Sequence, residues 1–238
     1  MRKIPTIALA LLCTAALWAD DAKPWKDQAQ LSYLSANGNT KSTTIGASNL
    51  FSWTTGRFLI ELPAGSLNTK SKGERTAEQY YAGEKLQYKI HDRNYAFEKF
   101  QWERNTFAGF DHRYDVSGGL GREFWKTDTD SLLAELGGGY INEQRVKTAG
   151  RTKFGSGRGY AKYSWKLSAT ADFSQDAEYL HNFKESRDYR VNTETALIAS
   201  LSTNLSLKVS YGWKFRNLPP PTFAKSDSLT AVSLIINY

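Results

Sequence analysis

The sequence predicts an all-β protein, specifically an antiparallel transmembrane β-barrel of about 12 strands. Three observations support this fold class. Apolar and polar residues alternate in short segments that are separated by turn residues, and no stretch has helical spacing. The face opposite the apolar one is charged rather than merely polar. Aromatic residues stand at the ends of the apolar faces, where a barrel meets the lipid headgroups.

The first 19 residues predict a cleavable signal peptide. Arg2 and Lys3 are positive, Ile4 to Leu17 is a short apolar run, and Ala19 offers a cleavage site. Residues 20–238 would then form a single barrel domain. The only cysteine, Cys13, lies in the predicted leader, so the mature chain would have no thiol for a disulfide, a metal or catalysis.

The first six alternating segments lie between residues 29 and 124. Their predicted apolar faces are Ala29, Leu31, Tyr33; Ile45, Ala47, Phe51, Trp53; Phe58, Ile60, Leu62; Tyr80, Ala82, Leu86, Tyr88, Ile90; Phe100, Trp102; and Tyr114, Val116, Leu120, Phe124. Each set has the period of two that places every second side chain on one face of a strand.

The second six segments continue the pattern to the end of the chain. Their predicted apolar faces are Leu132, Ala134, Leu136, Tyr140; Ala161, Tyr163, Trp165; Ala171, Phe173, Ala177, Tyr179; Tyr189, Val191, Leu197, Ala199, Leu201; Leu205, Leu207, Val209, Tyr211, Trp213, Phe215; and Thr230, Val232, Leu234, Ile236, Tyr238. The last strand ends on an aromatic residue. We therefore expect Tyr238 to close the barrel against the first strand and to act as an assembly signal.

Short and long connections alternate along the chain. TTG, HDR, KTDTD, KLS and STN are short, and LNTKSKGER, RNTFAGFDHR, VKTAGRT, LHNFKESRD and RNLPPPTFAKS are longer; only NGNT, at residues 37–40, is a short member of the second set. Outer-membrane barrels have short periplasmic turns and longer external loops. The pattern predicts an outer-membrane location in a Gram-negative bacterium, with both termini in the periplasm.

Charged residues lie out of phase with the apolar faces, so we expect them to point into the lumen. They are Lys85, Lys89, Lys99, Glu103, Asp115, Glu123, Glu135, Lys162, Asp172, Asp176, Arg190, Glu194, Lys208 and Lys214. The predicted lumen-lining charges are Lys85, Lys89, Glu135, Lys162, Asp172, Glu194, Lys208 and Lys214. These charges either pair and fill a narrow lumen, which we favour, or line a solute pathway.

The sequence offers little for catalysis or cofactor binding. Asp111 with His112, or His181 with Ser186, are the only groupings that could be forced into a hydrolase site. Two glycine runs, residues 118–121 and 137–139, are more simply places where the wall bends or where bulky inner side chains fit. We expect no catalytic residues, no metal and no cofactor.

The charge balance does not favour a nucleic-acid partner. The formal net charge is +7, and lysines and arginines are interleaved with acids rather than clustered. The expected partners are outer-membrane lipid and the outer-membrane assembly machinery, and any small solute or ion is unknown.

Four stretches occur in an order that resembles a known family. They are LSANGNTKSTT, RNTFAGFDHRYDVSGGLGREF, LLAELGGGY and LPPPTFAKSDS. From about Trp25 to Tyr238 the chain resembles the YdiY-like family of salt-induced outer-membrane proteins, a domain of unknown function. The resemblance implies an outer-membrane β-barrel and no reaction. The expected role is structural or stress-related with a narrow or plugged polar lumen; a small-solute channel and a membrane-embedded hydrolase or acyltransferase remain the alternatives.

Overall fold

The computed structural model describes residues 23–36, 42–106, 108–146, 150–220 and 223–238. The predicted signal peptide and the NGNT turn lie outside these residues. Within them, no helix is long and apolar enough to cross a membrane.

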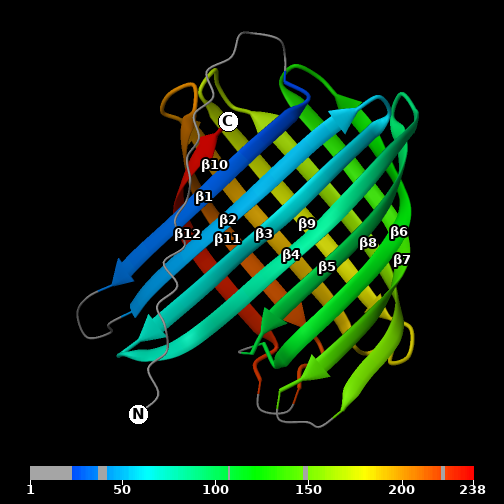
Figure 1. The fold of residues 1–238 in the computed structure, drawn as a ribbon, viewed down its shortest axis with the longest axis vertical. Coiled ribbons are helices and arrows are strands. Elements are labelled where there is room, and N and C mark those ends of the chain that lie inside the picture. The colour runs from blue at the N-terminus through cyan, green and yellow to red at the C-terminus, as the bar shows by residue number, and fades with distance from the viewer. Residues whose placement is uncertain (1–22, 37–41, 107, 147–149, 221–222) are drawn as a thin grey trace.

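The described chain forms one closed antiparallel barrel (Figure 1). Its strands are β1 Trp25–Ala36, β2 Ser42–Thr55, β3 Phe58–Ser71, β4 Glu74–His91, β5 Asn94–Asn105, β6 Phe110–Lys126, β7 Asp130–Arg145, β8 Arg151–Lys166, β9 Ala171–Asn182, β10 Tyr189–Ser200, β11 Leu205–Arg216 and β12 Ser226–Asn237. Each strand pairs with its neighbours in sequence, and β1 pairs with β12. The predicted all-β barrel of about 12 strands is confirmed.

The two faces of the wall are those that the alternation predicted. Val116 on β6 pairs with Phe100 on β5 and Tyr140 on β7, and all three side chains are exposed on the outer face. The intervening positions point inward, and Glu135 on that face is only 4% exposed. A membrane barrel needs this arrangement, because lipid takes the apolar face and the polar residues need water or partners.

We name the two ends of the barrel by their connections. The turn end carries the β2–β3, β4–β5, β6–β7, β8–β9 and β10–β11 connections and the C-terminus, and it is the upper end in Figure 1. The loop end carries the other connections. The β11–β12 connection at the loop end spans residues 217–225, whereas β2 and β3 at the turn end are joined by Gly56 and Arg57 alone.

Two predicted long connections are short in the structure. RNTFAGFDHR leaves only residues 106–109 between β5 and β6, because β5 runs to Asn105 and β6 begins at Phe110. LNTKSKGER was expected to be a long connection, but β3 runs to Ser71 and β4 begins at Glu74, so only Lys72 and Gly73 form the turn. Both have positive φ angles, 51° and 87°, as the tightest hairpins require. Polar side chains do not prevent strand pairing outside lipid, so the hairpin continues beyond the roughly 9–11 residues that cross a membrane.

The β1–β12 seam closes the barrel. Gln28 to Ser32 pair with Asn237 to Ser233, whereas β1 pairs with β2 along its whole length. Beyond the ladder, the Tyr238 amide donates to the carbonyl oxygen of Asp27 at 2.9 Å. The seam is therefore much shorter than the other strand pairings, and the last residue of the chain takes part in it.

Gly121 shows why glycine is needed in this wall. A Cβ atom at Gly121 would stand 2.2 Å from the Tyr95 ring, so the ring occupies the space that a side chain would take. Tyr95 is itself buried and reaches Glu135. The glycine thus makes room for one of the groups that hold the lumen charges, as the sequence analysis expected of bulky inner side chains.

Candidate functional site in the barrel lumen

Glu135 is the centre of a charge cluster midway along the lumen. Its carboxylate accepts hydrogen bonds from Lys85 Nζ at 2.5 Å, from Arg158 Nη1 at 2.8 Å and from the Tyr95 hydroxyl at 2.8 Å. These groups come from β4, β8 and β5, while Glu135 lies on β7. The strand alternation turns all four inward, and the cluster joins strands that are not neighbours in the sheet.

Arg158 extends this cluster to a second carboxylate. Its Nε donates to Glu178 on β9 at 2.7 Å, and Asn192 on β10 donates to the same carboxylate at 3.2 Å. Lys99 on β5 lies 3.5 Å from Glu178. Because β5 and β9 are four positions apart in the barrel order, the Lys99–Glu178 contact crosses the lumen.

A second cluster lies nearer the loop end and surrounds Glu143 of β7. This carboxylate is 0% exposed and contacts Arg190 at 2.7 Å, Arg216 at 3.1 Å and Arg145 at 3.4 Å. Arg216 also donates two hydrogen bonds to Asp188, which precedes β10. Buried carboxylates need such partners, since an unpaired buried charge costs several kcal/mol.

A chain of polar contacts joins opposite walls at the same end. Lys214 on β11 donates to Gln79 on β4 at 3.3 Å, although these strands are five positions apart in the barrel. Gln79 donates to Glu103 at 2.8 Å, and Glu103 lies 3.8 Å from Arg113. Side chains therefore cross the lumen at two levels, around Glu135 and around Glu143.

Two loop-end connections also meet. Gly109, between β5 and β6, has a φ of 89°, and a Cβ atom there would stand 2.7 Å from Pro220 Cγ and 3.2 Å from the Phe223 ring. Pro220 and Phe223 belong to the β11–β12 connection, which lies opposite the β5–β6 connection in the barrel order. The contact therefore lies across the loop-end opening.

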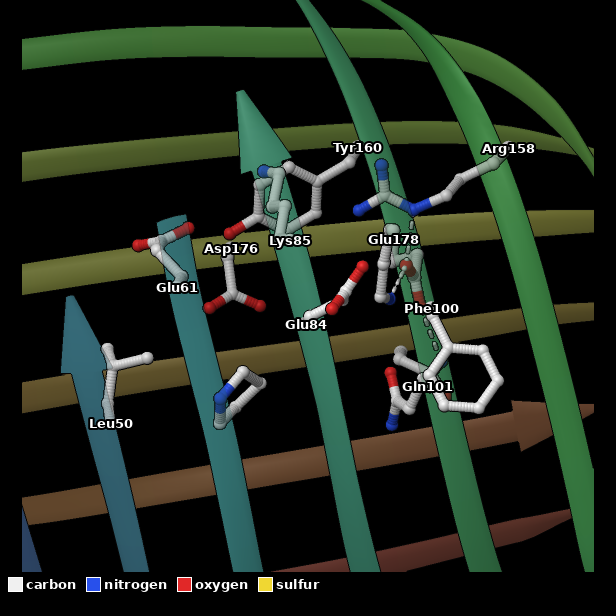
Figure 2. Close-up of a pocket in the computed structure, with 13 residues that line it drawn as sticks. Leu50, Glu61, Glu84, Lys85, Phe100, Gln101, Arg158, Tyr160, Asp176 and Glu178 are labelled. Atoms are coloured by element: carbon white, nitrogen blue, oxygen red, sulfur yellow. Dashed lines mark hydrogen bonds and ion pairs between the residues drawn. The ribbon is translucent and has the colours of Figure 1, made fainter. Parts of the chain in front are cut away.

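Between the two walls, the lumen contains a cavity of about 360 Å³ (Figure 2). Its lining residues are Leu50, Glu61, Pro63, Glu84, Lys85, Lys99, Phe100, Gln101, Arg158, Tyr160, Asp176, Glu178 and Asn192. They come from β2 to β5 on one side and from β8 to β10 on the other. The cavity thus adjoins the Glu135 cluster and is lined by charges of both signs.

The structure brings several of the predicted lumen charges together. Lys85 binds Glu135, and Lys208 Nζ donates to Glu194 at 2.6 Å. Lys162 is opposite Asp176 in the β8–β9 register, but no ion pair joins them in the described residues. Lys214 binds Gln79 rather than an acid. All of these residues occupy inward positions.

Two other predicted charges lie close to the turn end. Lys89 on β4 and Asp172 on β9 are both exposed, and neither forms an ion pair with a described residue. They occupy the inward phase of their strands near the rim, where water can solvate them. They therefore do not belong to either of the two clusters.

Sequence reasoning missed much of the clusters. The predicted lumen set lacked Glu143, Arg158, Glu178, Asp188 and Arg216. The strand period could have identified two of them. Glu143 follows Glu135 by eight residues, an even number, so both lie on the same face of one strand. Glu178 follows Asp172 by six residues and shares its face in the same way. Asp188 lies outside a strand, where alternation gives no information.

The histidines named in the sequence analysis lie toward the loop end. His112 Nε2 is 3.5 Å from Asp111, and its Nδ1 accepts a hydrogen bond from Trp102. His181 contacts the Tyr179 hydroxyl at 3.3 Å. Within the described residues, neither histidine is hydrogen-bonded to a serine.

Two carboxylates face outward between the aromatic ends of the wall, a feature that the sequence analysis did not anticipate. Glu84 and Glu98 are exposed and lie on the face opposite Lys85 and Lys99. Glu84 pairs with Phe100, and Glu98 pairs with Leu86 in the β4–β5 ladder, so the two acids are diagonal neighbours. Tyr80 and Tyr88 lie four residues on either side of Glu84 on the same face, which places Glu84 midway between the two aromatic ends of β4.

Comparison with known proteins identifies the family. A family model described as a protein of unknown function, DUF481, matches residues 29–238. The chain belongs to the DUF481 family. The uncharacterized protein YdiY of Escherichia coli strain K12 is 28% identical to this DUF481 protein over 219 residues, which cover 91% of this chain and 84% of YdiY. The family resemblance drawn from the sequence is confirmed.

Solved structures resemble the DUF481 barrel in fold. The COG4313 outer membrane channel from Pseudomonas putida F1 has a TM-score of 0.57 at 10% identity, over 92% of this chain and 97% of the channel. The translocator domain of the autotransporter NalP from Neisseria meningitidis has a TM-score of 0.49 at 14% identity, over 92% and 89% of the two chains. The closed barrel and its likeness to the COG4313 channel show that the DUF481 protein has a β-barrel fold of the outer-membrane type.

Proposed function

We propose that this protein is an outer-membrane barrel whose lumen is closed to solutes at rest, with a structural or stress-related role in the cell envelope. One observation carries the proposal: the Glu143 cluster joins β7, β10 and β11 across the loop-end half of the lumen. Glu143 has no exposed surface and binds arginines from two other strands, so the cluster occupies space that an open channel would need.

The Glu135 cluster, nearer the turn end, supports the same conclusion. Lys85 and Arg158 reach one carboxylate from β4 and β8, and the Lys99–Glu178 contact crosses between β5 and β9. Opposite charges pair well in a lumen of this size, which lies between small filled barrels and the wide porins. The contact of Pro220 with Gly109 adds apolar cover over the loop end.

Planar-bilayer recording tests the closed lumen. We expect the refolded wild type to show little or no conductance. Glu143→Gln removes the charge that holds Arg190 and Arg216, so this variant should give an anion-preferring leak. Glu185→Gln is the control, because the Glu185–Arg187 pair is solvent-exposed.

A folding check accompanies the recordings. Heat-modifiable gel migration should show that each variant is folded before its conductance is compared. A wild type that conducts steadily, with Glu143→Gln changing only the ion preference, would replace the closed lumen with the second candidate, a small-solute channel. The mixed-charge cavity is the observation that favours this alternative.

The hydrolase or acyltransferase alternative has less support. His112 is held by Asp111 and Trp102, and His181 is held by Tyr179, rather than by a serine nucleophile, in the residues that the structure describes. Activity on ester substrates that depends on His112 or His181 would revive it.

The cellular placement is also a proposal. We expect cleavage after Ala19, both termini in the periplasm, and contact with outer-membrane lipid and the assembly machinery. The mass of the mature protein tests the cleavage. A tag inserted next to Lys225 in the β11–β12 connection should be labelled on intact cells; labelling only after lysis would reverse the topology.

A further inference from the structure

Around the mid-lumen cavity, the positive charges have ion-pair partners and some of the carboxylates do not. Each of its cations already has a carboxylate: Lys85 binds Glu135, Arg158 binds Glu135 and Glu178, and Lys99 lies beside Glu178. A ligand anion would have to compete with these short contacts. The cations of the cavity are therefore poor candidates for ligand recognition.

Two cavity carboxylates at inward strand positions lack such partners; Glu84, the other unpaired acid of the lining, occupies the opposite phase of β4. Among the described residues, the Glu61 carboxylate on β3 accepts a single long hydrogen bond, 3.3 Å, from Gln87, which is neutral. The Asp176 carboxylate on β9 has no hydrogen bond or ion pair with any described residue, although Lys162 and Lys208 are close enough to influence it. The Glu61 and Asp176 carboxylates can therefore still accept hydrogen bonds from a ligand in the cavity.

These two acids lie on opposite walls. β3 and β9 are six positions apart in the barrel of 12 strands, the largest separation the barrel allows. Figure 2 shows Glu61 and Asp176 on different strands, both turned toward the cavity. A single bare metal ion needs ligand oxygens that converge within about 2.0–2.6 Å, which opposed walls do not provide. An extended organic cation that reaches from one wall to the other fits this geometry better.

The rest of the lining suits a short aliphatic body. Leu50 and Pro63 are paired neighbours on β2 and β3 and present apolar surface to the cavity. A volume of about 360 Å³ is roughly that of ten water molecules, which is ample for a small organic molecule.

We propose that this cavity binds a small aliphatic amine, with its ammonium groups on Glu61 and Asp176 and its methylene groups against Leu50 and Pro63. The inference goes beyond the proposed closed lumen, since a cavity on the turn-end side of the Glu143 cluster can hold a solute without letting it through. Carboxylates pair with ammonium groups through charge-assisted hydrogen bonds, which are the strongest contacts this lining can still make.

Isothermal titration of the folded mature chain with 1,4-diaminobutane at low salt tests the site. We expect saturable binding of the diamine and none of 1,4-butanediol, which has a similar shape without charge. Asp176→Asn and Glu61→Gln should each weaken binding about tenfold, the effect of losing one hydrogen bond between charged groups. Glu185→Gln, a change in an exposed loop acid, should bind as the wild type does.

Three results would overturn the proposal: no saturable binding to the folded wild type, equal binding of the diol, or unchanged binding in both cavity variants. Either variant alone suffices if the other fails to fold, since both acids contact the same ligand. The outcome is independent of the bilayer recordings, because a closed barrel can bind an amine and a conducting one can fail to.

Discussion

At the scale of single residues, glutamates on the inner and outer faces of the barrel wall have very different surroundings. Glu143 is enclosed by arginines, whereas Glu84 stands on the outer face with Phe100 as its ladder partner. A charge facing lipid at the midplane of a barrel destabilises it; Lys and Arg cost about 2–4 kcal/mol, and acids cost less. Glu84 is thus an unfavourable residue for stability alone.

Replacement of Glu84 should therefore stabilise the barrel. We expect Glu84→Leu to raise the free energy of unfolding in lipid vesicles by up to about 2 kcal/mol. Guanidinium titration followed by tryptophan fluorescence measures the change. Glu78→Leu is the control, because Glu78 lies on the same face of β4 but near the loop end, where it pairs with Arg75. Loss of stability in Glu84→Leu would mean that Glu84 has a partner in the membrane.

At the scale of strands and hairpins, the sequence best predicted which side chains of each strand point outward and which point into the lumen. Alternation from Tyr189 to Leu201 predicted the face of β10, and the register confirms it, with Val191 opposite Tyr179 and Phe215. Alternation cannot identify partners across the lumen. Lys85 binds Glu135, which lies three strands away in the barrel. This contact depends on strand tilt and side-chain length, and the local sequence pattern predicts neither of them.

The β3–β4 hairpin shows why a connection could be predicted too long. Leu67, Thr69 and Ser71 alternate with polar residues, so periodicity alone does not separate a polar strand from a polar loop. The Lys72–Gly73 pair was the available signal, because hairpin turns of two residues favour glycine at positive φ. Strand ends outside lipid are therefore predicted better by turn chemistry than by hydropathy.

Gly73 provides a test of that turn. Its φ is 87°, and a Cβ atom there would meet no atom within 4 Å, so only backbone strain opposes a side chain. We expect Gly73→Ala to lower the free energy of unfolding by about 1 kcal/mol. Gly159→Ala, where space is also open and φ is not positive, should stay within about 0.5 kcal/mol of the wild type. Equal losses of stability in the two variants would show that the positive φ at Gly73 does not constrain this turn.

At the scale of the whole molecule, the barrel closes through a short seam. The backbone pairing from Gln28 to Ser32 is reinforced by side chains: Gln28 donates to Asn237 at 3.1 Å and Gln30 donates to Ser233 at 2.9 Å. Asp27 and Tyr238 add the last backbone hydrogen bonds. In lipid every such group needs a partner, so each contact of a short seam matters more.

Removal of Tyr238 should therefore impair assembly. Deleting this residue takes away both backbone hydrogen bonds to Asp27. We expect less of the heat-modifiable folded band in the outer membrane, and a similar loss for Tyr238→Asp, which places a charge at the exposed end of the seam. Tyr211→Phe, a conservative change on β11, is the control. Normal assembly of both Tyr238 variants would contradict a role in closure.

The short seam also has a kinetic consequence. The side chains that meet across it are separated by 201–209 residues along the chain, whereas every other strand pairs with its immediate neighbour in sequence. Joining such distant ends costs chain entropy before any hydrogen bond is gained, so the hairpins should form first and the ends should meet last. Until then β1 and β12 expose unpaired edges. The rate of barrel formation should depend on contacts such as Ser32–Ser233, and changes there should slow folding more than they speed unfolding.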